Sequence, residues 1–205
     1  MVSYKQFITG QLGTNCYVVY DEEKNCVIID GDGNGQPILD FIQSEGLHVG
    51  MILLTHAHFD HMGATQTFRS AFACPVGIGK EDAPLLEDPS QNLSSFFGRP
   101  LSFSADRLFD DGDSFTVGTM QFTVLHTPGH TKGSVCYLVE NLLISGDTLF
   151  AGSCGRVDFP TGNAAQMMES LQRLANLDGD YTVLPGHEGL TTLSRERRLN
   201  PYLTD

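Results

Sequence analysis

The stretch ILLTHAHFDH, residues 52–61, places three histidines and an aspartate within six positions directly after an apolar run. The run predicts a buried strand. Side chains two positions apart in extended backbone point to the same side, so His56 and His58 can reach one metal ion. Asp60 and His61 follow where the chain turns into a helix, within reach of a second ion about 3.5–4 Å away. Packing gives no reason for four potential ligands at this density, and the stretch therefore predicts a metal centre.

Three further candidate ligands also follow short apolar runs. His130 stands in LHTPGHT and His187 in VLPGHEG, so the same Pro-Gly turn precedes both histidines. A tight turn at the end of a strand is a place where α/β sheets gather functional groups. Asp147 ends the apolar run LLISGD, and a carboxylate there could bridge two cations. The other two histidines are left out, His48 as a surface residue and His126 as a core or supporting residue.

Length and composition predict one domain over residues 1–205, since 205 residues with 40% hydrophobic content can bury one sizeable core. The formal charge of −13 would repel phosphate backbones and anionic lipids, so neither nucleic acid nor a membrane is an expected partner. No N-terminal segment resembles a signal peptide, and no run approaches the roughly 18 apolar residues of a membrane helix. Five scattered cysteines without a CxxC pair indicate reduced thiols and a cytoplasmic location.

Short β-branched runs alternate with segments of helical periodicity, and glycine or proline separates them. This order predicts an α/β fold in which mixed sheets carry helices on their outer faces. The segment Glu81 to Asp106 is rich in Pro, Ser and Asp, and we expect it to form an irregular flap. The expected helices are Pro37 to Ser44, Met62 to Phe72, Ala164 to Asn176 and Thr192 to Leu199. The expected strands include residues 15–20, 25–30, 51–55, 120–126, 133–139, 142–147 and 181–185.

The motifs resemble those of a known family. HAHFDH (56–61), TPGHT (127–131), SGDTLF (145–150) and PGHE (185–188) resemble, in order, the successive motifs of the metallo-β-lactamase superfamily. The segment Gly146 to Asn163 is similar to the glyoxalase II branch, the hydroxyacylglutathione hydrolases, and most of all to their short bacterial relatives. The resemblance implies an αββα sandwich and a site for two divalent ions, zinc first and iron or manganese as alternatives. It implies one metal site made by His56, His58 and His130, a second made by Asp60, His61 and His187, and Asp147 as the bridge between them.

The implied activity is hydrolysis of a small-molecule thioester of the S-lactoylglutathione type. Two ions lower the pKa of a shared water from 15.7 towards about 7 and so provide hydroxide at neutral pH. The hydroxide attacks the polarised carbonyl, the oxyanion is held by metal charge, and a thiolate leaves. Asp60 is the expected catalytic residue, because it can orient the hydroxide and take its proton. Only 18 residues follow His187, so we expect the protein to lack the helical C-terminal domain that supplies much of the glutathione pocket in full-length glyoxalase II.

Other functions remain open at this point. The run GSCGRVDF and the closing ERRLNP also resemble persulfide dioxygenases, which use a single iron held by the residues here numbered His56, His130 and Asp147. Lactonase activity fits the same motifs. A non-catalytic metal-binding module is disfavoured, because an open ligand set leaves a coordination position for water. β-Lactamase activity is disfavoured because His61 stands where those enzymes usually differ.

Several residues outside the ligand set could bind substrate or a further ion. Arg156, close after Asp147, is the expected substrate-binding residue. Arg195 to Arg198 are interpreted as a solvated helix end. The stretch Asp30 to Gly35 begins like a calcium loop but lacks its closing glutamate, so a plain turn is expected. Cys154 is interpreted as a small packing residue.

Overall fold

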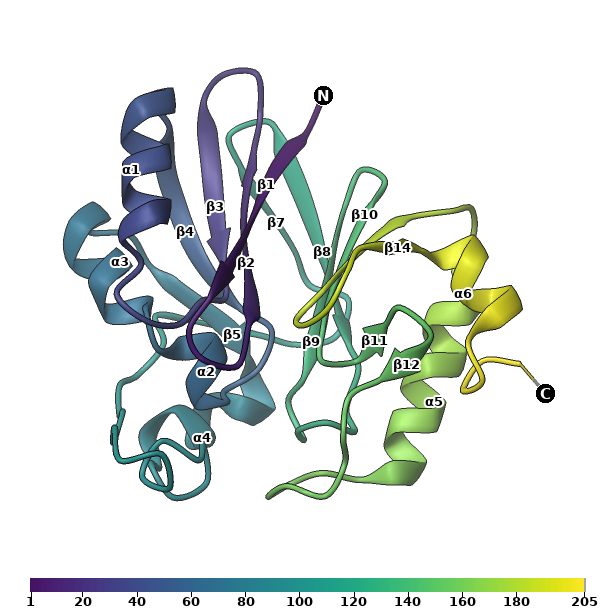
Figure 1. Ribbon diagram of the computed structural model, residues 1–205. Helices are drawn as coiled ribbons and strands as arrows, with labels where there is room; N and C mark the ends of the chain where they lie inside the picture. The colour runs from purple at the N-terminus through teal and green to yellow at the C-terminus, as the bar shows by residue number, and fades with distance from the viewer. Residues whose placement is uncertain (205) are drawn as a thin grey trace.

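Two six-stranded β-sheets lie at the centre of the computed structural model, which describes residues 1–204 (Figure 1). In the first sheet β1, β2 and β3 pair antiparallel, whereas β3 to β6 pair in parallel, so the sheet is mixed. Its strands, in spatial order, are β1 (Ser3–Thr9), β2 (Thr14–Tyr20), β3 (Asn25–Ile29), β4 (His48–Leu54), β5 (Val76–Gly79) and β6 (Arg107–Phe109).

The second sheet is also mixed, because β10 and β13 pair in parallel, whereas every other pair of neighbouring strands in this sheet is antiparallel. Its strands, in spatial order, are β14 (Thr191–Thr192), β13 (Thr182–Pro185), β10 (Leu142–Gly146), β9 (Val135–Val139), β8 (Met120–His126) and β7 (Ser114–Val117). A small hairpin of β11 (Leu149–Phe150) and β12 (Ser153–Cys154) follows β10.

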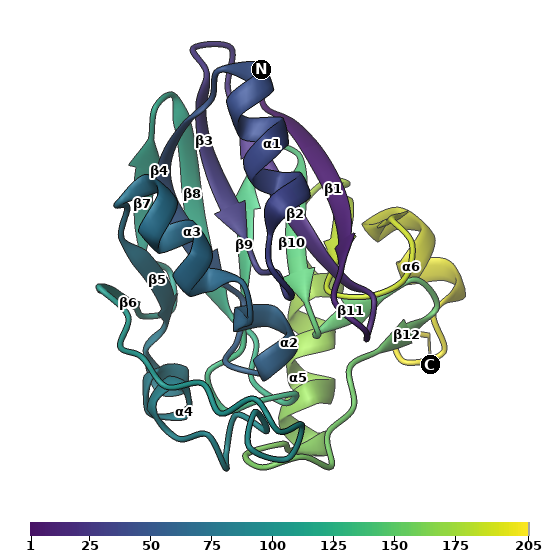
Figure 2. The same ribbon diagram turned by 60° about the vertical axis from the view of Figure 1, so that its left-hand side comes forward.

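Helices cover the outer face of each sheet (Figures 1 and 2). Ile38 and Phe68 pack α1 (Gln36–Glu45) and α3 (Thr65–Phe72) against the first sheet. Leu171 packs α5 (Ala164–Ala175) against the second sheet, and Leu193 begins α6 (Leu193–Leu199) in the same apolar cluster. A third cluster, which includes Tyr137, fills the space between the sheets. Three apolar layers between four layers of secondary structure confirm the predicted αββα sandwich.

One expected helix is wrong. The segment Met62 to Phe72 is divided at Gly63 and Ala64, so that α2 (Phe59–Met62) ends where the expected helix begins and α3 starts at Thr65. A Cβ at Gly63 would lie 2.1 Å from Asp32 Oδ1 and 3.1 Å from the Phe59 carbonyl oxygen, so a larger residue would displace the Asp32 side chain. The division matters because α2 carries two of the candidate ligands. The other three expected helices are present, and none of their ends is shifted by more than one residue.

The expected flap is more ordered than its composition suggests. It starts with the 3₁₀ turn η1 (Lys80–Asp82) and α4 (Ala83–Glu87), and irregular turns follow as far as β6. Strands β1, β5 and β6 were not assigned from the sequence; β5 (VGIG) and β6 are short, and β1 alternates only weakly. Among residues 1–204, no helix has both the length and the apolar character needed to cross a membrane.

Candidate metal centre

The seven candidate ligands all follow carboxyl ends of strands and meet at one edge of the sandwich. Six are buried, and His187 keeps 22% of its side chain exposed. Their positions are these: His56 and His58 follow β4, Asp60 and His61 lie on α2, His130 follows β8, Asp147 follows β10, and His187 follows β13. The structure therefore brings together every residue that the sequence singled out as a metal ligand.

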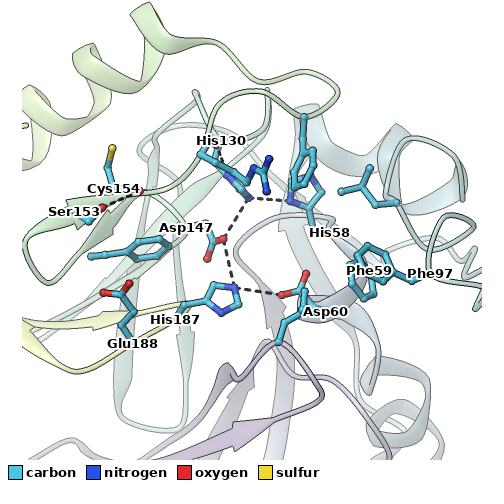
Figure 3. Close-up of a pocket in the computed structure, with 15 residues that line it drawn as sticks. His58, Phe59, Asp60, Phe97, His130, Asp147, Ser153, Cys154, His187 and Glu188 are labelled. Atoms are coloured by element: carbon cyan, nitrogen blue, oxygen red, sulfur yellow. Dashed lines mark hydrogen bonds and ion pairs between the residues drawn. The ribbon is translucent and has the colours of Figure 1, made fainter.

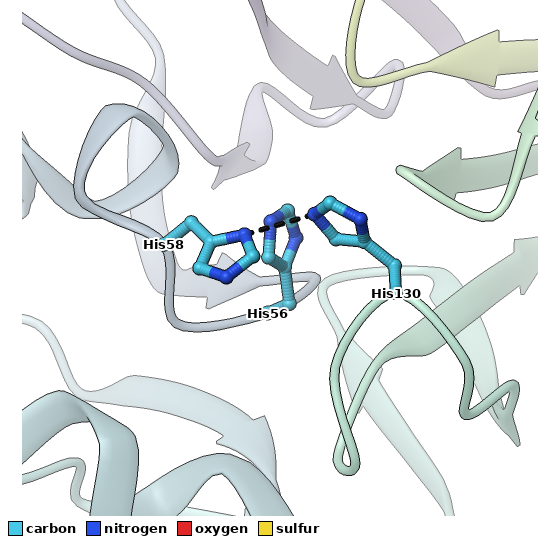
Figure 4. A group of neighbouring side chains, drawn as sticks. All are labelled: His56, His58 and His130. Carbon is cyan, nitrogen blue, oxygen red and sulfur yellow. Dashed lines mark hydrogen bonds between the residues drawn. The ribbon is translucent and has the colours of Figure 1, made fainter. Parts of the chain in front are cut away.

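His56, His58 and His130 form the first group (Figure 4). The His58 Nδ1 atom lies 2.8 Å from the His130 Nε2 atom, and the His56 ring stands edge-on to both other rings. His130 Nδ1 donates a hydrogen bond of 2.7 Å to the carbonyl of Arg156, which leaves Nε2 of a neutral ring free to act as a ligand. Within residues 1–204, the buried His56 Nε2 atom has no hydrogen-bond partner.

Asp60, His61 and His187 form the second group, with Asp147 between the two groups. Figure 3 shows Asp60, Asp147 and His187 of this set. The His187 Nε2 atom lies 3.3 Å from both His61 Nε2 and Asp60 Oδ2. Asp147 Oδ2 lies 3.4 Å from His130 Nε2 and 3.6 Å from His187 Nε2, while its Oδ1 lies 3.4 Å from His61 Nε2. One carboxylate thus faces ligand atoms of both groups, as a bridging ligand requires.

The charges of the cluster are strongly coupled. Burial opposes ionisation of Asp60 and Asp147, but neighbouring histidines outweigh it and lower both pKa values, that of Asp147 to about 2. Burial also opposes protonation of His61, yet the nearby carboxylates, Asp60 first, raise its pKa well above the usual range. Burial and His130 lower the pKa of His58 to about 3. The carboxylates therefore favour positive charge at His61 and His187, whereas burial and neighbouring histidines lower the pKa values of His56 and His58 and favour their neutral forms.

These features fit divalent metal ions. His56 Nε2 and Asp147 Oδ1 are buried polar atoms without a hydrogen-bond partner in the described chain, an arrangement that costs free energy unless a cation satisfies them. Neutral imidazoles and carboxylates are the donors that zinc and iron accept. A Cβ at Gly186 would lie 2.1 Å from Asp147 Oδ1, so glycine is needed to keep that carboxylate in place.

A layer of hydrogen bonds beneath the ligands fixes their orientation. Asp30 Oδ2 lies 2.9 Å from His61 Nδ1 and accepts a hydrogen bond of 2.8 Å from Thr55 Oγ1. Thr14 Oγ1 donates to Asp60 Oδ2 over 2.7 Å. These supporting roles are not predicted from the sequence. For Asp30 the sequence does offer an indication, because a carboxylate directly follows the buried strand NCVII, but the stretch predicts only a turn.

Asp82 links the two loops that carry the first group. Its Oδ2 accepts hydrogen bonds from the Ala57 amide, between His56 and His58, and from Thr131 Oγ1, next to His130. Its Oδ1 accepts one from the Gly133 amide. Burial raises the pKa of this carboxyl. Nothing local in the sequence of the expected flap reveals this role, because the contacts span 25 to 51 positions along the chain.

Five of the seven candidate ligands, all but His56 and His61, form the floor of a cavity of about 440 Å³, a size typical of small-molecule sites. Phe59 and Phe97 stack on one side with ring centroids 4.1 Å apart (Figure 3). The apolar residues that line the cavity are Leu12, Phe59, Leu93, Phe97, Phe150 and Phe159. The expected flap therefore contributes Leu93 and Phe97 to the walls of the pocket.

Arg156, the expected substrate-binding residue, also lines the cavity, but its guanidinium is already engaged. Its Nε and Nη2 atoms each donate to Asp158 over 2.7 Å, and its charge lies 3.9 Å above the ring centre of Phe159. Cys154, expected to be a packing residue, is half-buried and lines the cavity as well.

The residues left out of the site lie away from it. His126 Nε2 contacts the Lys132 carbonyl, and His48 is exposed. Arg195 pairs with Glu196, and Arg197 donates to carbonyls at the end of α5 and beyond it. All five cysteines are free.

Comparison with known proteins identifies the family. The sequence profile of the metallo-beta-lactamase superfamily matches residues 9–187, and the chain belongs to this superfamily. Hydroxyacylglutathione hydrolase GloC of Haemophilus influenzae is 33% identical over 195 residues, covering 92% of each chain. Among solved structures, BLEG-1 B3 metallo-beta-lactamase is 40% identical with a TM-score of 0.94, covering 99% of this chain and 100% of that one. TTHA1623 in a di-iron-bound form is 36% identical with a TM-score of 0.87, covering 97% and 100%. By class the protein is a metal-binding hydrolase.

Proposed function

We propose that the protein hydrolyses thioesters of the hydroxyacylglutathione type at a two-metal centre. The observation that carries this proposal is an open cluster of seven candidate ligands at the floor of a cavity, in a chain similar over nearly its full length to a hydroxyacylglutathione hydrolase. In the reaction, water adds its oxygen to the acyl carbon, the acyl–sulfur bond breaks, and the second proton of water passes to the departing thiolate or to solvent.

The proposed ligands divide into two sets with a shared member. His56, His58 and His130 would hold one ion and Asp60, His61 and His187 the other, with Asp147 between them. When bound, two divalent ions supply a water of lowered pKa and a charge that polarises the substrate carbonyl. Zinc is the first candidate, and iron is the second because a similar protein was solved in a di-iron-bound form.

The protein's own groups orient the reaction. The lowered pKa of Asp60 favours its ionised carboxylate, and Thr14 Oγ1 donates a hydrogen bond of 2.7 Å to its Oδ2 atom. This hydrogen bond fixes the carboxylate and leaves Oδ1 available to accept a proton. In that position Asp60 can accept the proton of an attacking water. The apolar side chains around the cavity exclude bulk water, which strengthens the electrostatic interactions of the reacting groups.

The test is hydrolysis of S-lactoylglutathione by purified protein loaded with zinc or with iron, with thiol release as the measurement. The proposal expects cleavage that chelation abolishes and added metal restores. Oxygen consumption with glutathione persulfide, without thioester cleavage, would instead identify the dioxygenase alternative. A lactone tested in parallel separates lactonase activity from thioesterase activity.

β-Lactam hydrolysis is the second candidate, because a structure at 40% identity over the whole chain is named a B3 metallo-beta-lactamase. The sequence predicts instead that β-lactam hydrolysis is disfavoured, because His61 stands where β-lactamases usually differ. The test gives the metal-loaded protein a chromogenic cephalosporin under the same conditions. The ratio of kcat/KM for S-lactoylglutathione to kcat/KM for the cephalosporin decides between the two functions.

A further inference from the structure

The walls of the cavity are apolar and partly uncovered. Leu12 and Phe97 stand at the mouth with 50% and 47% of their surface exposed. They come from the β1–β2 turn and from the irregular segment before β6, and both line the cavity together with Phe59. Exposed aromatic and aliphatic side chains at the mouth of a cavity indicate a surface that an apolar ligand covers.

The aromatic wall is held in position before any substrate binds. The Phe59 amide donates to the Asn92 carbonyl over 3.0 Å, which ties the segment that carries Phe97 to α2. The Asn92 side chain donates to the carbonyls of Leu85 and Leu101, each over 3.0 Å, and so closes the segment at its base. A preorganised wall contributes binding energy without an ordering cost.

Positive charge near the cavity is already neutralised. Apart from the candidate ligands, the charged residues that line it are Arg156, paired with Asp158, and Glu188. Arg99 lines the adjoining hollow, shared with Phe59 and Phe97, and lies 3.4 Å from Asp32. Glu188 is exposed and pairs with no cation among residues 1–204, since Arg156 and Arg195 pair with other carboxylates. Glutathione carries two carboxylates and one ammonium, so its carboxylates would meet no free cation on these walls and its net negative charge would meet the unpaired Glu188.

We infer that this pocket selects thioesters whose thiol portion is uncharged and apolar, with Leu12, Phe59 and Phe97 as the residues that determine specificity. The inference rests on the proposed thioesterase function and narrows its substrate class. Glutathione thioesters are then cleaved through the common acyl–sulfur chemistry at the floor, with a high KM because the peptide gains little from the walls.

The experiment keeps the lactoyl group fixed and varies the thiol. Metal-loaded protein is given S-lactoylglutathione, the lactoyl thioester of N-acetylcysteamine, and that of benzyl mercaptan. The expected order of kcat/KM is benzyl mercaptan, then N-acetylcysteamine, then glutathione, with at least tenfold between the first and the last, mainly in KM. Titration calorimetry with the corresponding thioethers, which cannot be hydrolysed, measures binding separately and should give the same order.

Two neighbouring phenylalanines provide a matched pair of variants. Phe97→Ala should raise KM for the benzyl thioester about tenfold and change KM for the glutathione thioester less than twofold. Phe96 is 86% exposed, does not line the cavity and meets Phe97 only edge-on, with ring centroids 5.5 Å apart, while Phe97 keeps its stack on Phe59, so Phe96→Ala should leave the ratio of the two kcat/KM values within twofold. Glu188→Gln should raise the ratio of kcat/KM for the glutathione thioester to that for the benzyl thioester about threefold.

Tightest binding and lowest KM for S-lactoylglutathione, or equal effects of Phe97→Ala on all three substrates, would overturn the inference and leave the thioesterase proposal standing. Failure to cleave any of the three thioesters would overturn the thioesterase proposal. In that case the thioether titrations still decide whether the wall prefers an apolar thiol group.

Discussion

The floor and the wall of the cavity are built in opposite ways. The floor consists of ionisable side chains that are almost fully buried and tied by hydrogen bonds to Asp30, Thr14 and neighbouring carbonyls. The wall consists of apolar side chains, most of them from turns, with Phe59 on α2 and Phe150 on β11; Leu12 and Phe97 are half exposed. The floor can therefore fix a reaction class, whereas the wall can change the preferred substrate without disturbing the floor.

The largest expected effect is at the floor. Asp60→Asn removes the proposed proton acceptor while retaining its size, and kcat for thioester hydrolysis should fall about 100- to 10,000-fold. Asp110→Asn is the control, because Asp110 is an exposed aspartate that pairs with Lys80 on the surface. Steady-state kinetics with metal analysis of both variants makes the measurement. Activity of Asp60→Asn within a few-fold of the parent would remove the distinction between floor and wall.

Metal removal should separate the two regions physically. Because a ligand at about 1,000 times its Kd stabilises the folded state by about 4 kcal/mol, chelation should lower the melting temperature substantially. Hydrogen exchange should quicken in the ligand-bearing loops, residues 55–62 and 127–134, and much less in residues 88–99 of the wall. Equal loss of protection in both regions would show that the wall depends on the metal.

The supporting layer gives a smaller effect. Asp30→Asn weakens the partner of His61 Nδ1, and changes of this kind cost about 10- to 100-fold in metal affinity or activity. Asp32→Asn is the matched control two positions along, because Asp32 is also buried but its carboxylate faces Arg99 and not a candidate ligand. Competition with a chelator measures the affinity. If both variants lose affinity equally, the loss reflects the loop and not the hydrogen bond to His61.

The smallest effect belongs to Arg156 in the wall. The Arg156 guanidinium is engaged by Asp158 and Phe159, and an exposed ion pair contributes little free energy. Arg156→Ala should therefore change kcat/KM for S-lactoylglutathione by no more than about twofold. Kinetics with S-lactoylglutathione and a truncated lactoyl thioester makes the comparison. A loss much larger for the full substrate than for the truncated one would reveal a glutathione site and support the role expected from the sequence.

The same contrast explains what the sequence could predict. The floor was predictable because its residues are rare types at strand ends, such as the repeated Pro-Gly-His before His130 and His187, and because each ligand acts close to its own strand. The helix Met62 to Phe72 is misplaced because the division between α2 and α3 falls at Gly63 and Ala64, whose backbone angles are close to helical, so periodicity gives no sign of it. The role of Asp82 was not predictable because its contacts lie 25 to 51 positions away along the chain.

The wall could not be predicted because its residues are ordinary apolar types in turns. Phe97 is placed by the stack on Phe59, and its segment is tied to α2 by the hydrogen bond between the Phe59 amide and the Asn92 carbonyl. For Arg156 the sequence predicts the place beside the site correctly, but it does not predict the ion pair with Asp158. The partners of a surface charge depend on turn geometry that composition does not specify.

The central claim is that the floor is a two-metal thioesterase centre, and a metal titration tests it most directly. Metal-free protein is titrated with zinc, and in parallel with iron under anaerobic conditions, while bound metal and the rate of S-lactoylglutathione hydrolysis are measured on the same samples. The account predicts that the rate rises until about two equivalents are bound, and that Asp147→Asn retains about one equivalent and loses hydrolysis. A full rate at one equivalent, or two bound equivalents with no thioester cleavage, would contradict it.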